Sequence, residues 1–259
     1  MSELLNPWGL TPLEWVVGFA GIRGAIAMYD HLVIFLVKLS GQKLLPTRTT
    51  GTPVRYVGLD TASIAFLTAN ALQEWVFVQQ LCHYIWHSPA VPHALGDLGV
   101  LNTVAALAVM FLVLDLFYAP AHYVMHLPRF YALVHKHHHR QHFPVRGYLD
   151  AGNEHPVEHL IGTSCTWIAV LSAVHTTGAH AATIFLFFNA HAALAMLNHS
   201  PYDVKFGLLG FSYSVRAHEM HHRKFTANYA QYFMLFDRLA STFIEYDDGA
   251  PPRGAKKMD

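Results

Sequence analysis

Residues 99–139 read GVLNTVAALAVMFLVLDLFYAPAHYVMHLPRFYALVHKHHH and join an apolar run directly to a histidine-rich segment. The apolar part, 99–120, has about the 20 residues that a helix needs to cross a bilayer. Two histidine clusters follow within twenty positions: His122 and His126 are four residues apart, and His135, His138 and His139 have the i, i+3, i+4 spacing. Because side chains three and four residues apart share one face of a helix, the stretch predicts a membrane helix followed by clustered imidazoles.

The composition of the whole chain is that of a membrane protein. Of its 259 residues, 53% are hydrophobic and 13% are charged, against about 25% charged in soluble domains. Three further apolar stretches lie at 12–37, 58–82 and 160–197. The last is too long for one crossing, and His175-Thr-Thr-Gly178 near its middle permits a hairpin. We therefore expect one all-α, polytopic domain over 1–259, with about four transmembrane helices and a helical histidine-box region.

The positive charges predict the orientation of the chain in the membrane. Sixteen of the 17 Lys and Arg residues fall in the segments 38–57, 121–159 and 198–259. Loops rich in Lys and Arg stay cytoplasmic, so these segments are expected in the cytosol. The histidine clusters lie in the last two of them. The chain ends Lys256-Lys257-Met258-Asp259, which looks like a dilysine retrieval signal and favours the endoplasmic reticulum membrane of a eukaryote.

A second histidine cluster near the end of the chain completes a candidate metal site. It is His218-Glu-Met-His221-His222, which repeats the H-x-x-H-H spacing of 135–139. Helical spacing aims two or three imidazoles of each cluster at one point. Eight imidazoles exceed the four ligands of a closed zinc site, so two metal ions are expected.

Other histidines have simpler interpretations. His83 and His87 repeat the H-x-x-x-H spacing, but the charge pattern puts them with His93 in the opposite, lumenal loop, where interfacial anchoring explains them. His175 and His180 are expected at the lumenal turn of the hairpin. His137 and His142 are expected beside the metal site or exposed.

Several other site classes lack their motifs. Cys82 and Cys165 are far apart, so neither a disulfide framework nor a cysteine metal site is expected. The net charge is zero, which gives no indication of nucleic-acid binding. No dinucleotide fingerprint, flavin site or haem-attachment motif is present in the sequence.

Around the histidine boxes the sequence resembles the fatty acid hydroxylase superfamily over roughly 100–245. That superfamily includes sterol desaturases, sterol 4-methyl oxidases, cholesterol 25-hydroxylase and fatty acid 2-hydroxylases. The matching stretches are Glu154-His155-Pro156-Val157-Glu158, His199-Ser-Pro-Tyr-Asp203, His221-His222-Arg-Lys-Phe-Thr-Ala-Asn228-Tyr229, and Phe236-Asp237-Arg238-Leu239. They are most similar to the sterol 4-methyl oxidase and cholesterol 25-hydroxylase branch. Departures from the pattern are Pro201 for Gly, Phe236 for Trp, and Leu239-Ala-Ser-Thr242 for an aromatic-Gly-Thr ending.

The resemblance implies a set of metal ligands. These are the box histidines His122, His126, His135, His138, His139, His218, His221 and His222, with His199 as a ninth. His155, His159 and His191 are candidates for an additional ligand. Catalysis is assigned to the metal pair itself, with no separate acid or base.

The resemblance also implies the chemistry. Two iron ions, with zinc possible in purified protein, would use dioxygen to oxidise a lipid, as in a sterol methyl oxidase or sterol hydroxylase. Electrons from NAD(P)H would arrive through cytochrome b5 and its reductase. The basic residues Arg216, Arg223 and Lys224 suit an acidic donor or, equally, anionic lipid headgroups.

Three alternatives remain open. One is a fatty acid or sphingolipid hydroxylase or desaturase of the same superfamily. A second is a zinc- or metal-handling membrane protein. A transporter should have polar groups along a path through the membrane, whereas the histidines here crowd at one interface. A third is a haem cytochrome, for which adjacent histidines on one turn are poorly placed.

Overall fold

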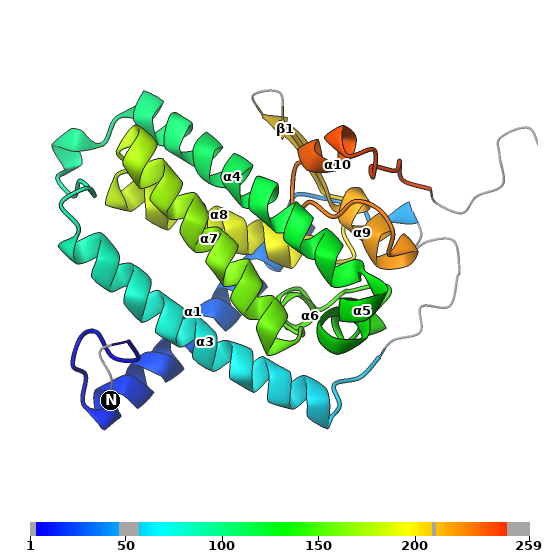
Figure 1. The fold of residues 1–259 in the computed structure, drawn as a ribbon, viewed down its shortest axis with the longest axis horizontal. Coiled ribbons are helices and arrows are strands. Elements are labelled where there is room, and N and C mark those ends of the chain that lie inside the picture. Colours follow the sequence, from blue (N-terminus) through cyan, green and yellow to red (C-terminus); the bar gives the residue numbers. More distant parts are fainter. Residues whose placement is uncertain (1–3, 47–56, 209–210, 248–259) are drawn as a thin grey trace, which may run out of the picture.

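The computed structural model describes residues 4–46, 57–208 and 211–247, which form a bundle of long helices (Figure 1). The long helices are α1 (Pro12–Leu39), α3 (Thr61–His87), α4 (Val100–His126), α7 (Pro156–Thr177) and α8 (Ala181–Asn198). Shorter helical elements are η1 (Leu95–Asp97), α5 (Pro128–Phe130), η2 (Tyr131–His135), η3 (His138–Arg140), α6 (Tyr148–Ala151), α9 (Val215–Lys224) and α10 (Leu235–Leu239). Two short antiparallel strands, β1 (Lys205–Leu208) and β2 (Phe211–Ser214), precede α9. The predicted all-α membrane fold is confirmed.

Four helices are long and apolar enough to cross a membrane: α1, α4, α7 and α8. The hairpin predicted in 160–197 is present, since α7 ends at Gly178 in the left-handed conformation and α8 begins at Ala181. The stretch predicted as a span at 58–82 forms α3, but α3 is not among the four. Polar residues such as Asn70, Glu74 and Gln79 lower its hydropathy, and Asn70 and Gln79 are buried inside the bundle.

The centre of the bundle is the contact between α4 and α7, which run side by side (Figure 1). Small and apolar residues are fully buried there, including Ala106 and Met110 of α4 and Ala169 and Ala173 of α7. Small side chains let two helices approach closely. In a membrane, where lipid is as apolar as the side chains, this close packing holds helices together.

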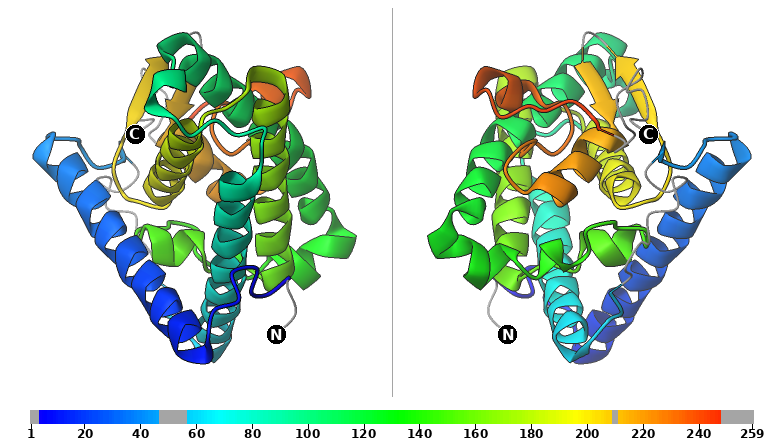
Figure 2. Two further views of the ribbon diagram at one scale, coloured as in Figure 1. Left: turned by 90° about the vertical axis from the view of Figure 1, so that its left-hand side faces the viewer. Right: turned by 90° about the vertical axis from the view of Figure 1, so that its right-hand side faces the viewer.

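Helix α1 lies at the edge of the bundle, contacts α3 and α8, and leans away from α3 toward its C-terminal end (Figure 2). It contacts α3 where Gly18 lies against Trp75, since a Cβ at Gly18 would be 2.6 Å from the indole ring. Arg23 pairs with Glu74 of α3 in the same region. Large apolar side chains such as Leu13, Met28 and Phe35 are exposed along α1, as expected of a helix that faces lipid.

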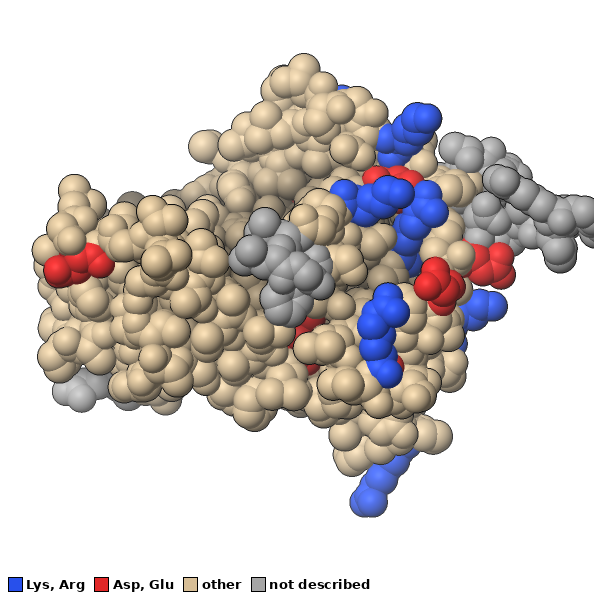
Figure 3. Space-filling view, turned by 90° about the horizontal axis from the view of Figure 1, so that it is seen from above, with Lys and Arg blue, Asp and Glu red and all other residues tan. Residues whose placement is uncertain are grey.

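The histidine-bearing segments meet at one end of the molecule. The last turn of α4, the first turns of α7, the end of α8 and the whole of α9 lie there (Figure 1). On the face shown in Figure 3, Lys and Arg side chains gather toward the same end. The dilysine-like sequence Lys256-Lys257-Met258-Asp259 lies outside the described residues.

Candidate metal centre

Nine histidines come together in two groups, and they are the nine predicted ligands. One group of five consists of His122, His126, His135, His139 and His221. The other group of four consists of His138, His199, His218 and His222. Within each group the ligand atoms all lie within 4.8 Å of one another. We refer to them below as the five-histidine group and the four-histidine group.

Each H-x-x-H-H cluster divides its histidines between the two groups. His218 and His222 of α9 belong to the four-histidine group, while His221, between them in sequence, belongs to the five-histidine group. In 135–139 the division is reversed, because the outer pair joins the five-histidine group and His138 joins the other. Of the two or three imidazoles per cluster that were expected to share one point, two do so in each cluster. The i and i+4 positions share one target and the i+3 position has another.

The 135–139 cluster also departs from a regular α-helix. His135 ends the π-helical turn η2, and His138 begins the 3-10 turn η3. This change of helical pitch orients successive imidazoles differently from the way they would point on α9.

Distances between ring nitrogens fit shared metal ions. Neighbouring Nε2 atoms within each group are 2.9 to 3.3 Å apart. With metal–nitrogen bonds of 2.0 to 2.1 Å, two ligands of one ion are separated by about 2.9 Å at right angles and about 3.3 Å at the tetrahedral angle. The donor set therefore fits one metal ion in each group.

Hydrogen bonds to the Nδ1 atoms of the imidazoles show which ring nitrogen can bind a metal ion. Backbone carbonyls face four of the Nδ1 atoms: His122 with Tyr229 O at 2.7 Å, His221 with Ala227 O at 2.8 Å, His199 with Ala195 O at 2.9 Å, and His222 with Gln141 O at 3.1 Å. A carbonyl only accepts, so these Nδ1 atoms carry the proton and each Nε2 presents a lone pair. Such support of ligand histidines from behind is usual in metal sites.

Glu158 also lies behind a ligand histidine, His135, in a close contact that does not have hydrogen-bond geometry. Glu158 Oε1 lies 2.7 Å from His135 Nδ1, and both side chains are buried. His122 Nε2 and His135 Nε2 face each other at 2.9 Å, a separation that two ligands of one metal ion would have.

Burial keeps these imidazoles neutral. Loss of hydration lowers the pKa of His135, His138, His139, His218 and His222 well below the ordinary value, and neighbouring histidines lower it further. Burial also lowers the pKa of His221 to about 4. Neutral imidazole is the form that binds metal, so the site is ready to bind at physiological pH.

The segment after α9 holds two of the ligands in place. The carbonyls of Ala227 and Tyr229, which hold His221 and His122, belong to this loop. Asp237, fully buried, accepts hydrogen bonds from the Tyr229 and Ala230 amides at 2.7 Å each and from the Thr242 hydroxyl at 2.7 Å. The run Asn228-Tyr229 and Asp237 therefore orients the histidine boxes from behind.

Neither group includes the three candidates for an additional ligand. His155 caps the first turn of α7 by accepting from Val157 N. His159 Nδ1 lies 2.8 Å from Glu154, and His191 Nδ1 lies 2.7 Å from the Tyr232 hydroxyl.

Other histidines lie outside the two groups as well. His137 contacts Asn153 at 2.9 Å, and His142 is exposed beside Phe225. His83 and His87 stack at 4.1 Å near Trp8. His175 is exposed near the α7–α8 turn, and buried His180 lies 3.1 Å from Ala94 O.

A cavity of about 540 Å³ opens onto the four-histidine group. It is bounded by α1, α3, α4, α7 and α8, and His138, His199 and His218 line one part of it. Most of its wall is apolar, with residues such as Ile26, Leu114 and Phe188. In the described part of the chain no member of the five-histidine group lines it. The four-histidine group is thus the one that faces a ligand in this cavity.

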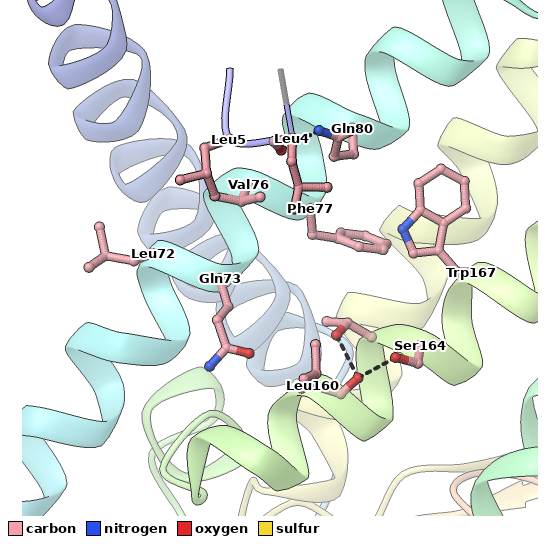
Figure 4. Close-up of a pocket in the computed structure, with 11 residues that line it drawn as sticks. Leu4, Leu5, Leu72, Gln73, Val76, Phe77, Gln80, Leu160, Ser164 and Trp167 are labelled. Carbon is pink, nitrogen blue, oxygen red and sulfur yellow. Dashed lines mark hydrogen bonds between the residues drawn. The ribbon is translucent and has the colours of Figure 1, made fainter. Parts of the chain in front are cut away.

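A second hollow of about 430 Å³ lies between α3 and α7 (Figure 4). Leu4 and Leu5 lie over it, and Phe77 points toward Trp167 across it. Thr163 lines both this hollow and the larger cavity. Its lining within the described residues contains no histidine, so the hollow lies outside the candidate metal centre.

Sequence reasoning missed the carboxylates behind the ligand histidines. Glu158 and Asp237 were noted only as parts of matching stretches, although one lies against His135 and the other holds the loop behind His122 and His221. An acidic residue in the first turn of a helix that begins with proline was the available signal for Glu158.

Comparisons with known proteins agree with the geometry. A sequence profile of the family described as fatty acid hydroxylase matches residues 107–242. The C-4 methylsterol oxidase of Schizosaccharomyces pombe is 25% identical over 76% of this chain and 64% of its own length. Methylsterol monooxygenase 1 of Rattus norvegicus is 28% identical over 48% of this chain and 42% of its own length.

A third relative comes from the hydroxylases. A cholesterol 25-hydroxylase-like protein of Caenorhabditis briggsae is 28% identical over 67% of this chain and 57% of its own length. The chain thus spans about two fifths to two thirds of the length of these relatives. No solved structure matches this chain.

Proposed function

This chain belongs to the fatty acid hydroxylase family, and we propose from that premise that it is a membrane-bound di-iron oxygenase that oxidises a lipid with dioxygen. The observation that supports the proposal best is the division of nine buried histidines into two groups beside an apolar cavity.

The five-histidine and four-histidine groups would each hold one iron ion. A pair of iron ions bound there supplies the redox chemistry that activates dioxygen and oxidises an unreactive C–H bond. Zinc fits the same imidazoles but has no redox chemistry, so zinc-loaded protein would be inactive.

The protein's own residues orient and shield the site. The carbonyls of Ala227, Tyr229 and Gln141 fix the ring orientations of three imidazoles, and Glu158 lies against a fourth, His135. The cavity wall holds an apolar body beside His138, His199 and His218 and excludes water from it.

For the substrate we favour a sterol, oxidised by a sterol methyl oxidase or sterol hydroxylase reaction. Two of the relatives named above are a methylsterol oxidase and a methylsterol monooxygenase. A cavity of about 540 Å³ is within the usual range of about 300 to 1,000 Å³ for small-ligand sites. A fatty acyl or sphingolipid substrate is the alternative, since a relative in Mycosarcoma maydis is a fatty acid hydroxylase.

Electrons would come from NAD(P)H through cytochrome b5 and its reductase, on the cytosolic side of the endoplasmic reticulum. An acidic donor would approach the end that carries the Lys and Arg side chains. Of the three basic residues considered, Arg216 is already paired with Asp203 at 2.6 and 2.8 Å, while Lys224 is exposed. Lys224 is therefore the better candidate contact.

The proposal is tested with purified, iron-loaded protein in nanodiscs, supplied with cytochrome b5, its reductase and NADH. We expect about two irons per chain and oxygen consumption that depends on a 4-methylsterol or another lipid. Product analysis by mass spectrometry separates hydroxylation from desaturation. Absence of oxygen consumption with every sterol and fatty acyl lipid, in protein that retains its iron, would contradict the proposal.

A further inference from the structure

We propose that His159, with Glu74, Tyr148 and Glu154 around it, binds a neutral hydroxyl group of the lipid, so that the oxidised carbon lies within a few bonds of that hydroxyl. The inference rests on the proposed function and specifies the substrate class of the same cavity. All four residues line the cavity that opens onto the four-histidine group.

These residues form two adjacent polar pairs in the cavity wall. Glu74 of α3 pairs with Arg23 of α1 and accepts a hydrogen bond from the Tyr148 hydroxyl at 2.7 Å. His159 Nδ1 lies 2.8 Å from Glu154 Oε1. Its other nitrogen, Nε2, is 3.9 Å from Glu74 Oε1, too far for a hydrogen bond.

The free nitrogen of His159 is what points to a ligand. The residue is 8% exposed, and its Nε2 atom is buried with no hydrogen-bond partner among the described residues. A buried polar atom without a partner costs about 1 to 3 kcal/mol. The pairing of Arg23 with Glu74 explains how α1 is held to α3 but leaves this atom unexplained. A ligand group in the cavity would satisfy it.

The surroundings select a neutral group over an anionic one. Glu74 and Glu154 both lie beside His159, and the one nearby cation that the contacts show, Arg23, is already paired with Glu74. A carboxylate headgroup would face two acidic side chains and be repelled. A hydroxyl both donates and accepts, so it can pair with His159 Nε2 in either protonation state of the ring.

Neighbouring contacts hold the cluster rigidly, as recognition requires. Asn70 of α3 donates to the carbonyls of Gly152 and Glu154 at 3.0 and 2.8 Å, which fixes the segment that carries Glu154. Gly147, at a φ of +58°, lies so close to Asp30 of α1 that a Cβ would be 2.4 Å from Oδ1. That close approach lets the Tyr148 amide donate to Asp30 at 3.1 Å.

The position of the cluster along the cavity sets which carbon reacts. Glu154 has a carboxylate oxygen within 4.8 Å of a ring nitrogen of His138, a member of the four-histidine group. The apolar lining extends along α8 to Phe185, 14 residues before His199, or about 21 Å at 1.5 Å per residue. If the hydroxyl of a lipid lies at His159, the carbons near that hydroxyl lie beside the four-histidine group. The apolar body of the lipid then extends along α8 toward Phe185.

The experiment measures hydroxyl recognition with and without turnover. Binding of a 4-methylsterol and of its 3-deoxy counterpart is measured in nanodiscs on zinc-loaded protein, which binds without reacting. We expect the alcohol to bind about tenfold more tightly, the effect of one good hydrogen bond. In His159→Phe, which keeps an aromatic ring but has no nitrogen, we expect that preference to fall to about one. Exposed His175→Phe, on the same helix but far from the cavity, is the matched control and should keep the preference.

Turnover by iron-loaded wild-type protein then reports the position of oxidation. We expect the product to carry its new oxygen within a few bonds of the hydroxyl, and His159→Phe to raise KM for the alcohol with little change for the deoxy compound. Equal binding of the two lipids by wild-type protein, or oxidation at the end of the molecule remote from the hydroxyl, would overturn the inference. Loss of turnover on all lipids with the binding preference intact would instead count against the proposed function alone.

Discussion

Histidines 221 and 222 are adjacent in sequence, yet they lie in different histidine groups, each of which we propose to hold one metal ion. We therefore expect His221→Ala and His222→Ala each to lose one of two bound ions, and a different one in each case. His221 is one of five nitrogen donors in its group, and His222 is one of four in the other. Each single variant should retain about one tightly bound ion per chain.

The magnitude follows from the ligand count. Loss of a residue that only supports a ligand lowers metal affinity about 10- to 100-fold, so loss of a ligand should cost at least about 100-fold, or roughly 2.7 kcal/mol. After His221→Ala four donors remain around the ion, whereas after His222→Ala only three remain. The His222→Ala variant should therefore release its ion at a lower chelator concentration than the His221→Ala variant.

The assay is metal content by mass spectrometry after equilibration with graded chelator. Two double variants separate the groups. His218→Ala with His222→Ala removes two donors from one group and should still leave about one ion, whereas His221→Ala with His222→Ala should leave almost none. Exposed His142→Ala serves as the control and should retain both ions. If the His218/His222 variant retained less metal per chain than the His221/His222 variant, the assignment of histidines to the two groups would be wrong.

Three further results are expected. Glu158→Ala should weaken one of the two ions about 10- to 100-fold in the same chelator assay, because the side chain that lies 2.7 Å from His135 Nδ1 is lost; unchanged content at every chelator concentration would contradict this role. Asp237→Asn should lower the free energy of unfolding by about 1.5 to 3 kcal/mol, because a buried carboxylate that accepts hydrogen bonds from the Tyr229 and Ala230 amides is lost. The measurement is the midpoint of thermal unfolding in detergent, which should fall, with exposed Asp97→Asn as the control. Metal-free protein should lose stability as the pH falls from about 6.5 toward 4, and its stability should not depend on pH just above that range. Burial lowers the pKa of His221 in the folded protein to about 4. The unfolded chain therefore binds protons at a higher pH than the folded chain does, and protonation favours unfolding. Melting curves between pH 4 and 8 check the sign, and a midpoint that rises on acidification would refute it.

The fold was largely predictable because membrane helices are local features of a sequence. Apolar stretches of sufficient length and the turn sequence that ends in Gly178 predicted α1, α4 and the α7–α8 hairpin. Helix α3 was predicted as a membrane span, but its amide and carboxylate side chains face the bundle and the cavity, and hydropathy along a segment does not report which way a side chain faces. The strands β1 and β2 were not anticipated, since four-residue strands carry little periodicity.

The sequence by itself determined which side chains can bind metal. All nine histidines that lie in the two groups were identified from spacing and resemblance, because imidazoles at i, i+3 and i+4 are near one another on any helical turn. Only the tertiary structure decided how they divide. The partner of each imidazole comes from another segment, as when His221 of α9 meets His139 of η3 at 3.1 Å, and the angles between helices are set by packing over the whole bundle. The same holds for His159. The sequence made it a candidate ligand, whereas in the fold it lies in the wall of the cavity beside Glu154 and belongs to neither histidine group.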